Sequence, residues 1–262
     1  MSETTDRAAR AALVELAERE GAHPVEVVQG AADVPLVFDS PHSGRYYPED
    51  FSSVVSLKLL REYEDRFVDL LIQGATGHGV TTISAHFPRA YIDPNRAPDD
   101  IDEEMLEAVW PDPLSPTRHS EQGTGLIFRR MHDESQIYDR PLTVEEVQRR
   151  LDGCWRPYHA ALQAALASAR QESGVVWHIN WHSMRPVGDV MTPDPGNKRS
   201  DFVLGDRQGQ SCEPAFTSFV ADRLEAMGYS VAINHPYQGA YIVERYGKPR
   251  DGTHSLQIEI NR

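Results

Sequence analysis

Residues 34–44 read VPLVFDSPHSG, an apolar run that passes directly into a turn-prone segment. The run at 34–40 has the length and composition of a buried β-strand, and the SPHSG segment has the proline, serine and glycine that are typical of a turn. His42 therefore stands at the carboxyl end of a predicted strand, where its ring is not needed for packing. The alternative interpretation is a loop histidine that bonds a nearby backbone group.

A second segment of the same kind follows further along the chain. The apolar run at 175–181 predicts another strand, and His182 and Ser183 come at its end within NWHSMRP, residues 180–186. Open α/β sheets place their ligand sites at the carboxyl ends of strands. Two His-Ser pairs in this position therefore indicate one site to which both histidines contribute.

The remaining strands and helices alternate along the chain. Further strands are predicted at 80–87, 202–204, 229–233 and 255–260, and helices at 59–71, 143–166 and 211–227. This alternation predicts an α/β fold, a single domain over residues 1–262 with one mixed β-sheet flanked by helices. Residues 8–20 have helical periodicity, so we expect residues 1–30 to be a helical lead-in to the domain.

Local signals refine this outline at three places. Thr143 and Glu146 have the spacing of a capping box, which predicts the start of a helix, and Pro157 should kink or divide that helix. Residues 89–125 are rich in proline, aspartate and glycine and lack periodicity. We expect them to form a long ordered loop over a functional site.

The bulk composition excludes several classes of function. A net charge of -14 disfavours binding to nucleic acid or to anionic membranes, because both depend on a basic surface. No apolar run approaches the length of a membrane span, and the N-terminus lacks the pattern of a secretory signal. Two cysteines are too few for a disulfide scaffold. We expect a soluble cytoplasmic protein with a small-molecule partner; a homo-oligomer is compatible with the sequence.

The two histidines are typical ligands of a metal. Two imidazoles and one carboxylate form a common catalytic zinc site that leaves one coordination position open, and iron, cobalt or manganese would accept the same ligands. The carboxylate could come from the predicted helix at 59–71, which carries Glu62, Glu64, Asp65 and Asp69. Spacing does not choose among these four, and most helical acids belong to a solvated face.

Two arginines mark a third candidate segment, HFPRAYIDPNR at 86–96. Arg89 and Arg96 bracket a short stretch stiffened by proline, which could direct two guanidinium groups toward a carboxylate or a developing oxyanion. The alternative is that both arginines form surface ion pairs with Asp93, Asp99 or Asp100. An acidic protein that binds an anion needs a local arginine pocket, which favours the first interpretation.

The C-terminal part of the chain holds the last two candidates. In NHPYQGAYI, residues 234–242, Gly239 between Tyr237 and Tyr241 would allow close approach of a substrate to the backbone, although a simple turn is the alternative. In LQIEINR, residues 256–262, Glu259 interrupts an apolar strand. It is either exposed on an alternating strand or placed in a dry site, where burial would make it a good general base.

Taken in order, six segments resemble those of the N-formylglutamate amidohydrolase family. They are SPHSG, DRFVD, PRAYIDPNR, NWHSMRP, NHPYQGAYI and QIEINR, and the resemblance runs from about residue 34 to the end. It implies an architecture similar to zinc carboxypeptidases and aspartoacylase-type deacylases. It also implies one zinc per chain, and as its ligands His42, Asp65 and His182.

The same resemblance implies a reaction, the hydrolysis of N-formyl-L-glutamate or another small acidic N-acyl amino acid. Glu259 would take a proton from water that zinc has acidified, and would return it to the leaving amine. Arg96 would stabilise the oxyanion, and Arg89 or Arg185 would anchor the substrate carboxylate. The remaining substrate-binding candidates are Asn95, Tyr237, Gly239 and Tyr241.

Two departures limit what the resemblance implies about the substrate, and a third concerns the support of His182. Gln238 and Ala240 flank Gly239 where glutamate-specific members have a basic Gly-Gly loop, and the order of Glu244 and Arg245 differs. Asn180 stands where an acid is common, two residues before His182. The alternatives are a deacylase or carboxypeptidase-like hydrolase for another amide, and a metal-binding regulatory protein without catalysis. Neither Ser43 nor Cys212 lies in a nucleophile motif.

Overall fold

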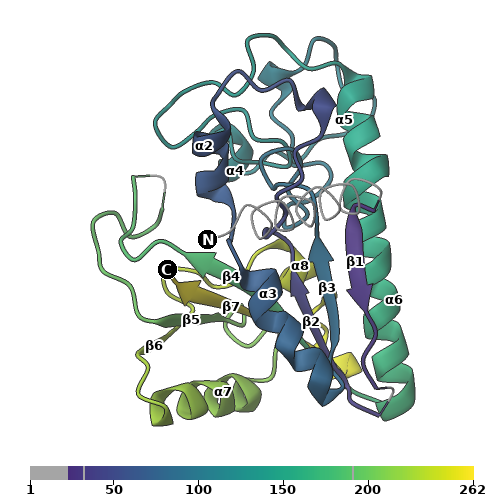
Figure 1. The fold of residues 1–262 in the computed structure, drawn as a ribbon, viewed down its shortest axis with the longest axis vertical. Helices are drawn as coiled ribbons and strands as arrows, with labels where there is room; N and C mark the ends of the chain where they lie inside the picture. The colour runs from purple at the N-terminus through teal and green to yellow at the C-terminus, as the bar shows by residue number, and fades with distance from the viewer. Residues whose placement is uncertain (1–22, 32, 191) are drawn as a thin grey trace, which may run out of the picture.

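The computed structural model describes residues 23–31, 33–190 and 192–262, and these residues build one mixed sheet with helices on both faces (Figure 1). Its seven strands have the order β1-β3-β2-β4-β7-β5-β6. They are β1 (Val25–Val28), β2 (Leu36–Ser40), β3 (Thr81–Ala85), β4 (Val176–Met184), β5 (Phe202–Gly205), β6 (Val231–Ile233) and β7 (Thr253–Asn261). The central strands β3, β2, β4 and β7 are parallel, whereas β1 and β5 run antiparallel to their neighbours β3 and β7. The predicted mixed α/β sheet is therefore confirmed.

Helices cover the sheet from both sides. They are α2 (Leu57–Leu60), α3 (Val68–Gln73), α4 (Arg118–Glu121), α5 (Val144–Arg150), α6 (Arg156–Ser173), α7 (Pro214–Ala226) and α8 (Tyr241–Tyr246). In the view of Figure 1, α3 and α7 lie in front of the sheet and α6 and α8 behind it. Within the described residues, no helix has both the length and the hydropathy for crossing a bilayer.

Strand alternation gives the two faces of the sheet different characters. On β4, Trp177, Ile179 and Trp181 point to the face covered by α7, where the ring of Phe216 stacks 4.3 Å from that of Trp177. The residues between them point to the face covered by α6, and they are His178, Asn180 and His182. All three of these polar residues are buried, whereas Trp177 and Trp181 on the opposite face are only partly buried. The α6 face of the sheet therefore carries chemistry inside the protein.

The strand predictions are confirmed, with shifts of a few residues at their ends. Two findings differ from expectation. β4 continues to Met184, so His182 lies inside the strand and not after it. Residues 25–28 form β1, so the expected helical lead-in over residues 1–30 does not extend that far. The helix expected at 8–20 lies outside the described residues.

The single helix expected at 59–71 is wrong. The chain forms α2, then a 3-10 turn, then an extended residue at Glu64, and it enters α3 through Phe67 in a left-handed conformation (φ 67). Phe67 and Leu71 of the expected apolar face are exposed, at 63% and 64%. The break occurs because Asp65 is bound elsewhere: its N–H donates to the carbonyl of His42 at 2.9 Å.

The other local predictions are confirmed. The Thr143 hydroxyl accepts from the Glu146 N–H and the Glu146 carboxylate accepts from the Thr143 N–H, so the capping box is complete. The helix is divided ahead of Pro157 by a π-helical turn at residues 151–155. Residues 89–125 form a long loop with only short turns and α4, in which residues 89–102 are buried or half-buried and residues 106–121 are mostly exposed. α8, by contrast, was not predicted.

Candidate metal and active site

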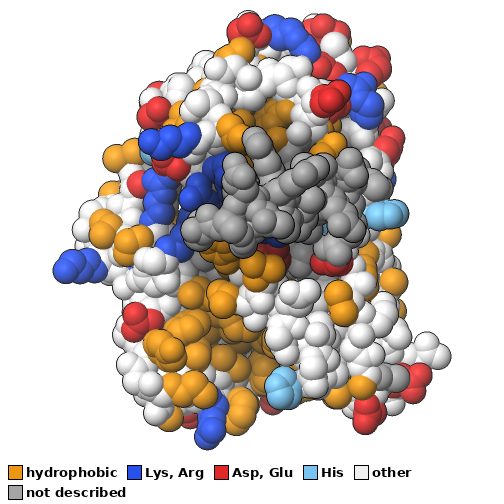
Figure 2. All heavy atoms as spheres, in the orientation of Figure 1, with side chains coloured by type: hydrophobic (Ala, Val, Ile, Leu, Met, Phe, Trp, Pro, Cys, Tyr) orange, Lys and Arg blue, Asp and Glu red, His pale blue; other side chains and the backbone are white. Residues whose placement is uncertain are grey.

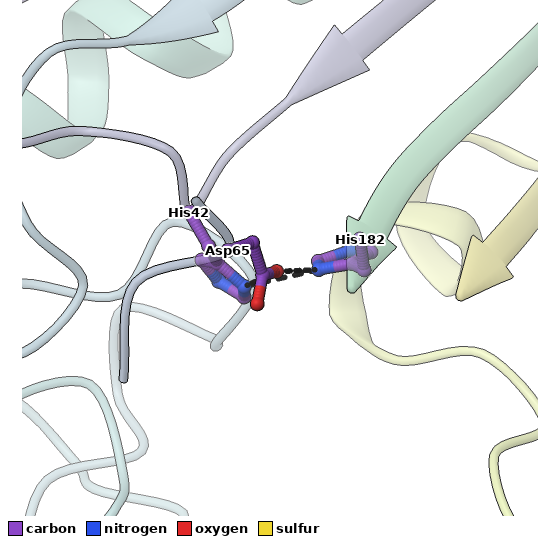
Figure 3. Close-up of side chains that lie close together, drawn as sticks. All are labelled: His42, Asp65 and His182. Carbon is purple, nitrogen blue, oxygen red and sulfur yellow. Dashed lines mark hydrogen bonds and ion pairs between the residues drawn. The ribbon is translucent and has the colours of Figure 1, made fainter. Parts of the chain in front are cut away.

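Three side chains from distant parts of the chain meet at one edge of the sheet. His42 follows β2, His182 lies near the end of the neighbouring parallel strand β4, and Asp65 lies in the break between α2 and α3. All three are buried, and one ligand atom from each lies within 4.8 Å of the others. Figure 3 shows the rings facing each other with the carboxylate beside them. The other acids of the 59–71 segment are not in this cluster.

Hydrogen bonds between two loops hold Asp65 in place. The Ser43 hydroxyl donates to the Asp65 carbonyl at 3.0 Å and accepts from the Asp69 N–H at 3.2 Å. Together with the bond from Asp65 N–H to the His42 carbonyl, these contacts tie the SPHSG turn to the DRFVD turn. The two segments therefore form one rigid corner that supplies two of the three side chains.

The outer nitrogen of each histidine ring is occupied by a hydrogen-bond acceptor. His42 Nε2 lies 2.7 Å from Asp93 Oδ1, and His182 Nε2 lies 2.7 Å from Asn180 Oδ1. The Asn95 amide nitrogen is a more distant neighbour of His182 Nε2, at 3.3 Å. In the neutral form of each ring these acceptors favour the proton on Nε2, which leaves Nδ1 with its lone pair.

The two Nδ1 atoms face each other at 3.0 Å. Asp65 Oδ2 lies 3.1 Å from Nδ1 of His182 and 3.3 Å from Nδ1 of His42. Burial raises the pKa of Asp65, but its contacts with His182 and His42 outweigh burial and hold the pKa below 3.8. Three acceptor atoms thus converge on one point. This donor set fits a divalent cation, and nitrogen with oxygen ligands suits zinc.

Asp93 is a site residue that the sequence did not identify, since it was considered only as a partner of the arginines. It is fully buried, and its Oδ1 accepts from His42 and from the Asn95 N–H at 2.8 Å. Its Oδ2 accepts two bonds from Arg89, at 3.1 and 2.7 Å. Burial raises its pKa, but Arg89 and His42 lower it well below the ordinary value. The sequence signal that could have identified Asp93 as a site residue is its position directly before Pro94.

Glu259 faces the cluster from the adjacent strand, since it is the register partner of His182 between β4 and β7. The amide nitrogen of Gln257 donates to Glu259 Oε1 at 3.0 Å. Burial, reinforced by the charge of Asp65, raises the pKa of Glu259 above its ordinary value, although His182 and Arg89 oppose this. The expected alternative of an exposed residue does not hold, because Glu259 is buried.

A cavity of about 380 Å³ opens over the cluster, a volume typical of small-molecule sites. Five arginines and four acids line it, so an acidic protein has a basic pocket here. The arginines are Arg89, Arg96, Arg185, Arg199 and Arg262. On the face drawn in Figure 2, Lys and Arg side chains gather at the upper left, between α2 and the end of β4.

One of these guanidinium groups has no carboxylate partner among the described residues. Arg96 donates to the carbonyls of Thr124 and Asn95, at 3.2 and 2.9 Å, and its Nη2 lies 3.3 Å from His119 Nδ1. Burial lowers its pKa, as expected for a cation without a paired anion. The other four contact acids, for example Arg185, which lies 3.3 Å from both Glu62 and Asp189.

The remaining predicted substrate residues divide between the pocket and its surroundings. Asn95, Tyr237 and Gly239 line the cavity. Gly239 has φ 102, and a Cβ there would lie 2.5 Å from Val243 Cγ2, which explains the glycine. Tyr241 lies outside the cavity lining. As the first residue of α8, it packs its ring 5.7 Å from that of His159.

Comparisons with known proteins agree on one family. A family model described as N-formylglutamate amidohydrolase matches residues 34–262. An N-formylglutamate deformylase of Pseudomonas aeruginosa is 31% identical over 235 residues, which span 87% of this chain and 80% of the relative. An N-formylglutamate deformylase of Pseudomonas putida is 29% identical over 239 residues, with the same two shares.

Solved structures show the same relationship. The crystal structure of N-formylglutamate amidohydrolase from Ralstonia eutropha JMP134 matches with a TM-score of 0.85 and 44% identity, covering 91% of this chain and 86% of that one. A gene product of Agrobacterium tumefaciens matches with a TM-score of 0.64 and 21% identity, covering 93% and 86%. The second likeness shows a shared fold alone.

Proposed function

The chain belongs to the N-formylglutamate amidohydrolase family, and from this premise we propose that it is a zinc-dependent enzyme that hydrolyses N-formyl-L-glutamate to formate and L-glutamate. The observation that carries the proposal is the convergence of three buried acceptor atoms beside Glu259 at the base of a basic pocket. The proposal treats residues 1–262 as one catalytic domain of zinc-carboxypeptidase-like architecture.

The metal would be held by His42, Asp65 and His182, whose donor atoms fit a zinc ion. A bound zinc ion supplies Lewis-acid chemistry: it polarises a carbonyl oxygen and lowers the pKa of water to about 7. The chain's own contribution to binding is a set of rings that Asp93 and Asn180 orient from behind. Such outer partners commonly raise metal affinity by 10 to 100-fold.

Glu259 is the proposed general base. Its raised pKa matches a group that takes a proton from water and later gives it up. After that transfer, the hydroxide oxygen forms a bond with the formyl carbon. Glu259 returns the proton to the amide nitrogen as the bond between this carbon and the nitrogen breaks, so the nitrogen leaves as the amine of L-glutamate.

The charges in the pocket favour exchanging the roles first expected for the two arginines. Arg89 is neutralised by Asp93, and the charges of Asp65 and Glu259 also act on it, so it lies close to the reacting centre. Its Nη1 takes no part in the Asp93 pair, which suits a donor to the carbonyl oxygen. Among the residues that the structure describes, Arg96 pairs with no carboxylate. We therefore assign the substrate carboxylate to Arg96.

The proposal is tested by separating metal binding from turnover. Chelation should abolish the release of formate and L-glutamate, and zinc should restore it. Glu259→Gln should keep its metal content but lose about 10² to 10⁴ in kcat, whereas Glu172→Gln, at an exposed position of α6, should change neither. Full activity of metal-free protein, or of Glu259→Gln, would contradict the proposal.

The second candidate function is the same chemistry on another N-acyl amino acid. Gln238 and Ala240, two of the departures from the family pattern, both line the cavity. A panel of N-acyl amino acids assayed for free amine separates the two candidates. A regulatory metal-binding protein would bind zinc and hydrolyse none of them.

Ser255, His178 and Asp39 are hydrogen-bonded in series like a serine hydrolase triad. All three are fully buried, so this series does not favour a serine hydrolase.

A further inference from the structure

Two carboxamides stand one step behind the site, side by side on neighbouring strands. Asn180 on β4 pairs in register with Gln257 on β7, and each precedes a site residue by two positions, which puts it on the same face of its strand. Asn180 lies 2.7 Å from His182 and Gln257 lies 3.0 Å from Glu259. The orientation of each amide therefore decides whether the site residue next to it faces a hydrogen-bond donor or an acceptor.

A carboxamide can present either its oxygen or its nitrogen, so something must fix its orientation. For Gln257, the Ala240 N–H donates to Oε1 at 3.0 Å, which turns Nε2 toward Glu259. For Asn180, the fixing group is Asp39 on β2, the register partner of Asn180. Asn180 Nδ2 donates to Asp39 Oδ1 at 2.8 Å, which turns the amide oxygen toward His182.

Asp39 can act only as an acceptor toward Asn180. It is fully buried, and two further donors hold it as a carboxylate: His178 Nε2 at 2.9 Å on Oδ1, and the Tyr158 hydroxyl at 2.6 Å on Oδ2. A flipped Asn180 would set its oxygen against that carboxylate, which is strongly unfavourable in a buried site. The flipped form is therefore disfavoured by Asp39 and not by His182.

We propose that Asp39 is a positioning residue that acts through Asn180. Asp39 fixes the Asn180 amide so that the amide oxygen accepts from His182 Nε2. The lone pair of His182 Nδ1 is then directed to the metal position. With the amide flipped, its N–H would face Nε2, the ring proton would move to Nδ1, and that proton would occupy the metal side of the ring. His42 needs no such relay, because Asp93 contacts its Nε2 directly. The inference rests on the metal site of the proposed function.

Asp39→Asn is the discriminating change, because the side chain keeps its size but can then accept or donate. Two readouts follow: the tautomer of His182 in metal-free protein, from ring ¹⁵N NMR, and zinc affinity by competition with a chelating dye. We expect a mixture of tautomers and zinc binding weakened by about 10 to 100-fold. Tyr158→Phe is the matched control, because it removes a bond to Asp39 but leaves Oδ1 facing Asn180. It should lower stability and leave the tautomer and zinc affinity unchanged.

Exchanging the two residues tests the relay directly. In the double variant Asp39→Asn/Asn180→Asp, a carboxylate would face His182 and an amide would donate to it from behind, so zinc affinity should return to that of the natural protein. Asn180→Asp alone sets two carboxylates together and should bind zinc weakly.

Unchanged tautomer and affinity in Asp39→Asn would overturn the inference. Equal weakening by Tyr158→Phe, or a folded double variant that still binds zinc weakly, would also overturn it. If the unchanged protein binds zinc with the Nε2–H tautomer yet releases no formate from N-formyl-L-glutamate, the proposed function fails and the relay stands.

Discussion

Replacing Arg96 with methionine should weaken turnover of N-formyl-L-glutamate without removing the metal. The guanidinium lies in the pocket with three neutral acceptors and no carboxylate partner among the described residues, so a substrate anion would be its first full counter-charge. A hydrogen bond to a charged group contributes about 1.5–3 kcal/mol, and a forked contact makes two. We expect a loss of about 3–5 kcal/mol, which is roughly 10² to 10³·⁵ in kcat/KM.

Most of this loss should appear in KM, because an anchor remote from the reacting bond holds the ground state and the transition state alike. The assay compares three substrates: N-formyl-L-glutamate, its side-chain amide and its α-carboxamide. The loss caused by Arg96→Met should nearly vanish for whichever amide lacks the carboxylate that Arg96 binds. Arg118→Met, at an exposed position outside the cavity lining, is the control. An equal loss on all three substrates would refute the assignment and return Arg96 to the oxyanion.

Three further predictions follow from the described contacts. Asp93→Asn should weaken zinc binding by about 10 to 100-fold, measured by competition titration, because His42 loses its carboxylate partner. Gly239→Ala should destabilise the protein by about 1–3 kcal/mol in urea unfolding, because its φ of 102 and a Cβ contact at 2.5 Å both oppose a side chain. The hydrogen bond from Arg140 lowers the pKa of Glu146 from 4.5 to about 2. The contribution of this contact to the stability of the fold is therefore complete above pH 4.5 and is lost as the pH falls toward 2. Glu146→Gln should flatten the acid slope of the unfolding free energy over that range.

The sheet and its two histidines could be predicted because their signals are local. Apolar runs of strand length, each followed by turn residues, place His42 and His182 at the same edge once the strands are parallel. The capping box at Thr143 is likewise complete within four residues. Such features depend on neighbours along the chain, and the printed sequence contains them.

The break at Asp65 could not be predicted in this way. Periodicity at 59–71 is helical, but the bond from Asp65 N–H to the His42 carbonyl joins residues far apart in sequence. That Arg96 contacts no carboxylate within the described part of the chain could not be predicted either, because the fold decides which acid each arginine contacts. Asp39 did carry a signal: like Glu259, it interrupts an apolar strand, and the sequence interpretation weighed only Glu259.

The position of β7 has a consequence for how the protein is made. Among the described strands β7 is the last along the chain, yet it lies between β4 and β5 and bonds to both. During translation, six strands leave the ribosome as two unjoined pieces of sheet, β1-β3-β2-β4 and β5-β6. A nascent polypeptide that stops short of residue 253 would lack both this bridge and Glu259. The same short segment therefore joins the two parts of the sheet and delivers Glu259, the proposed general base.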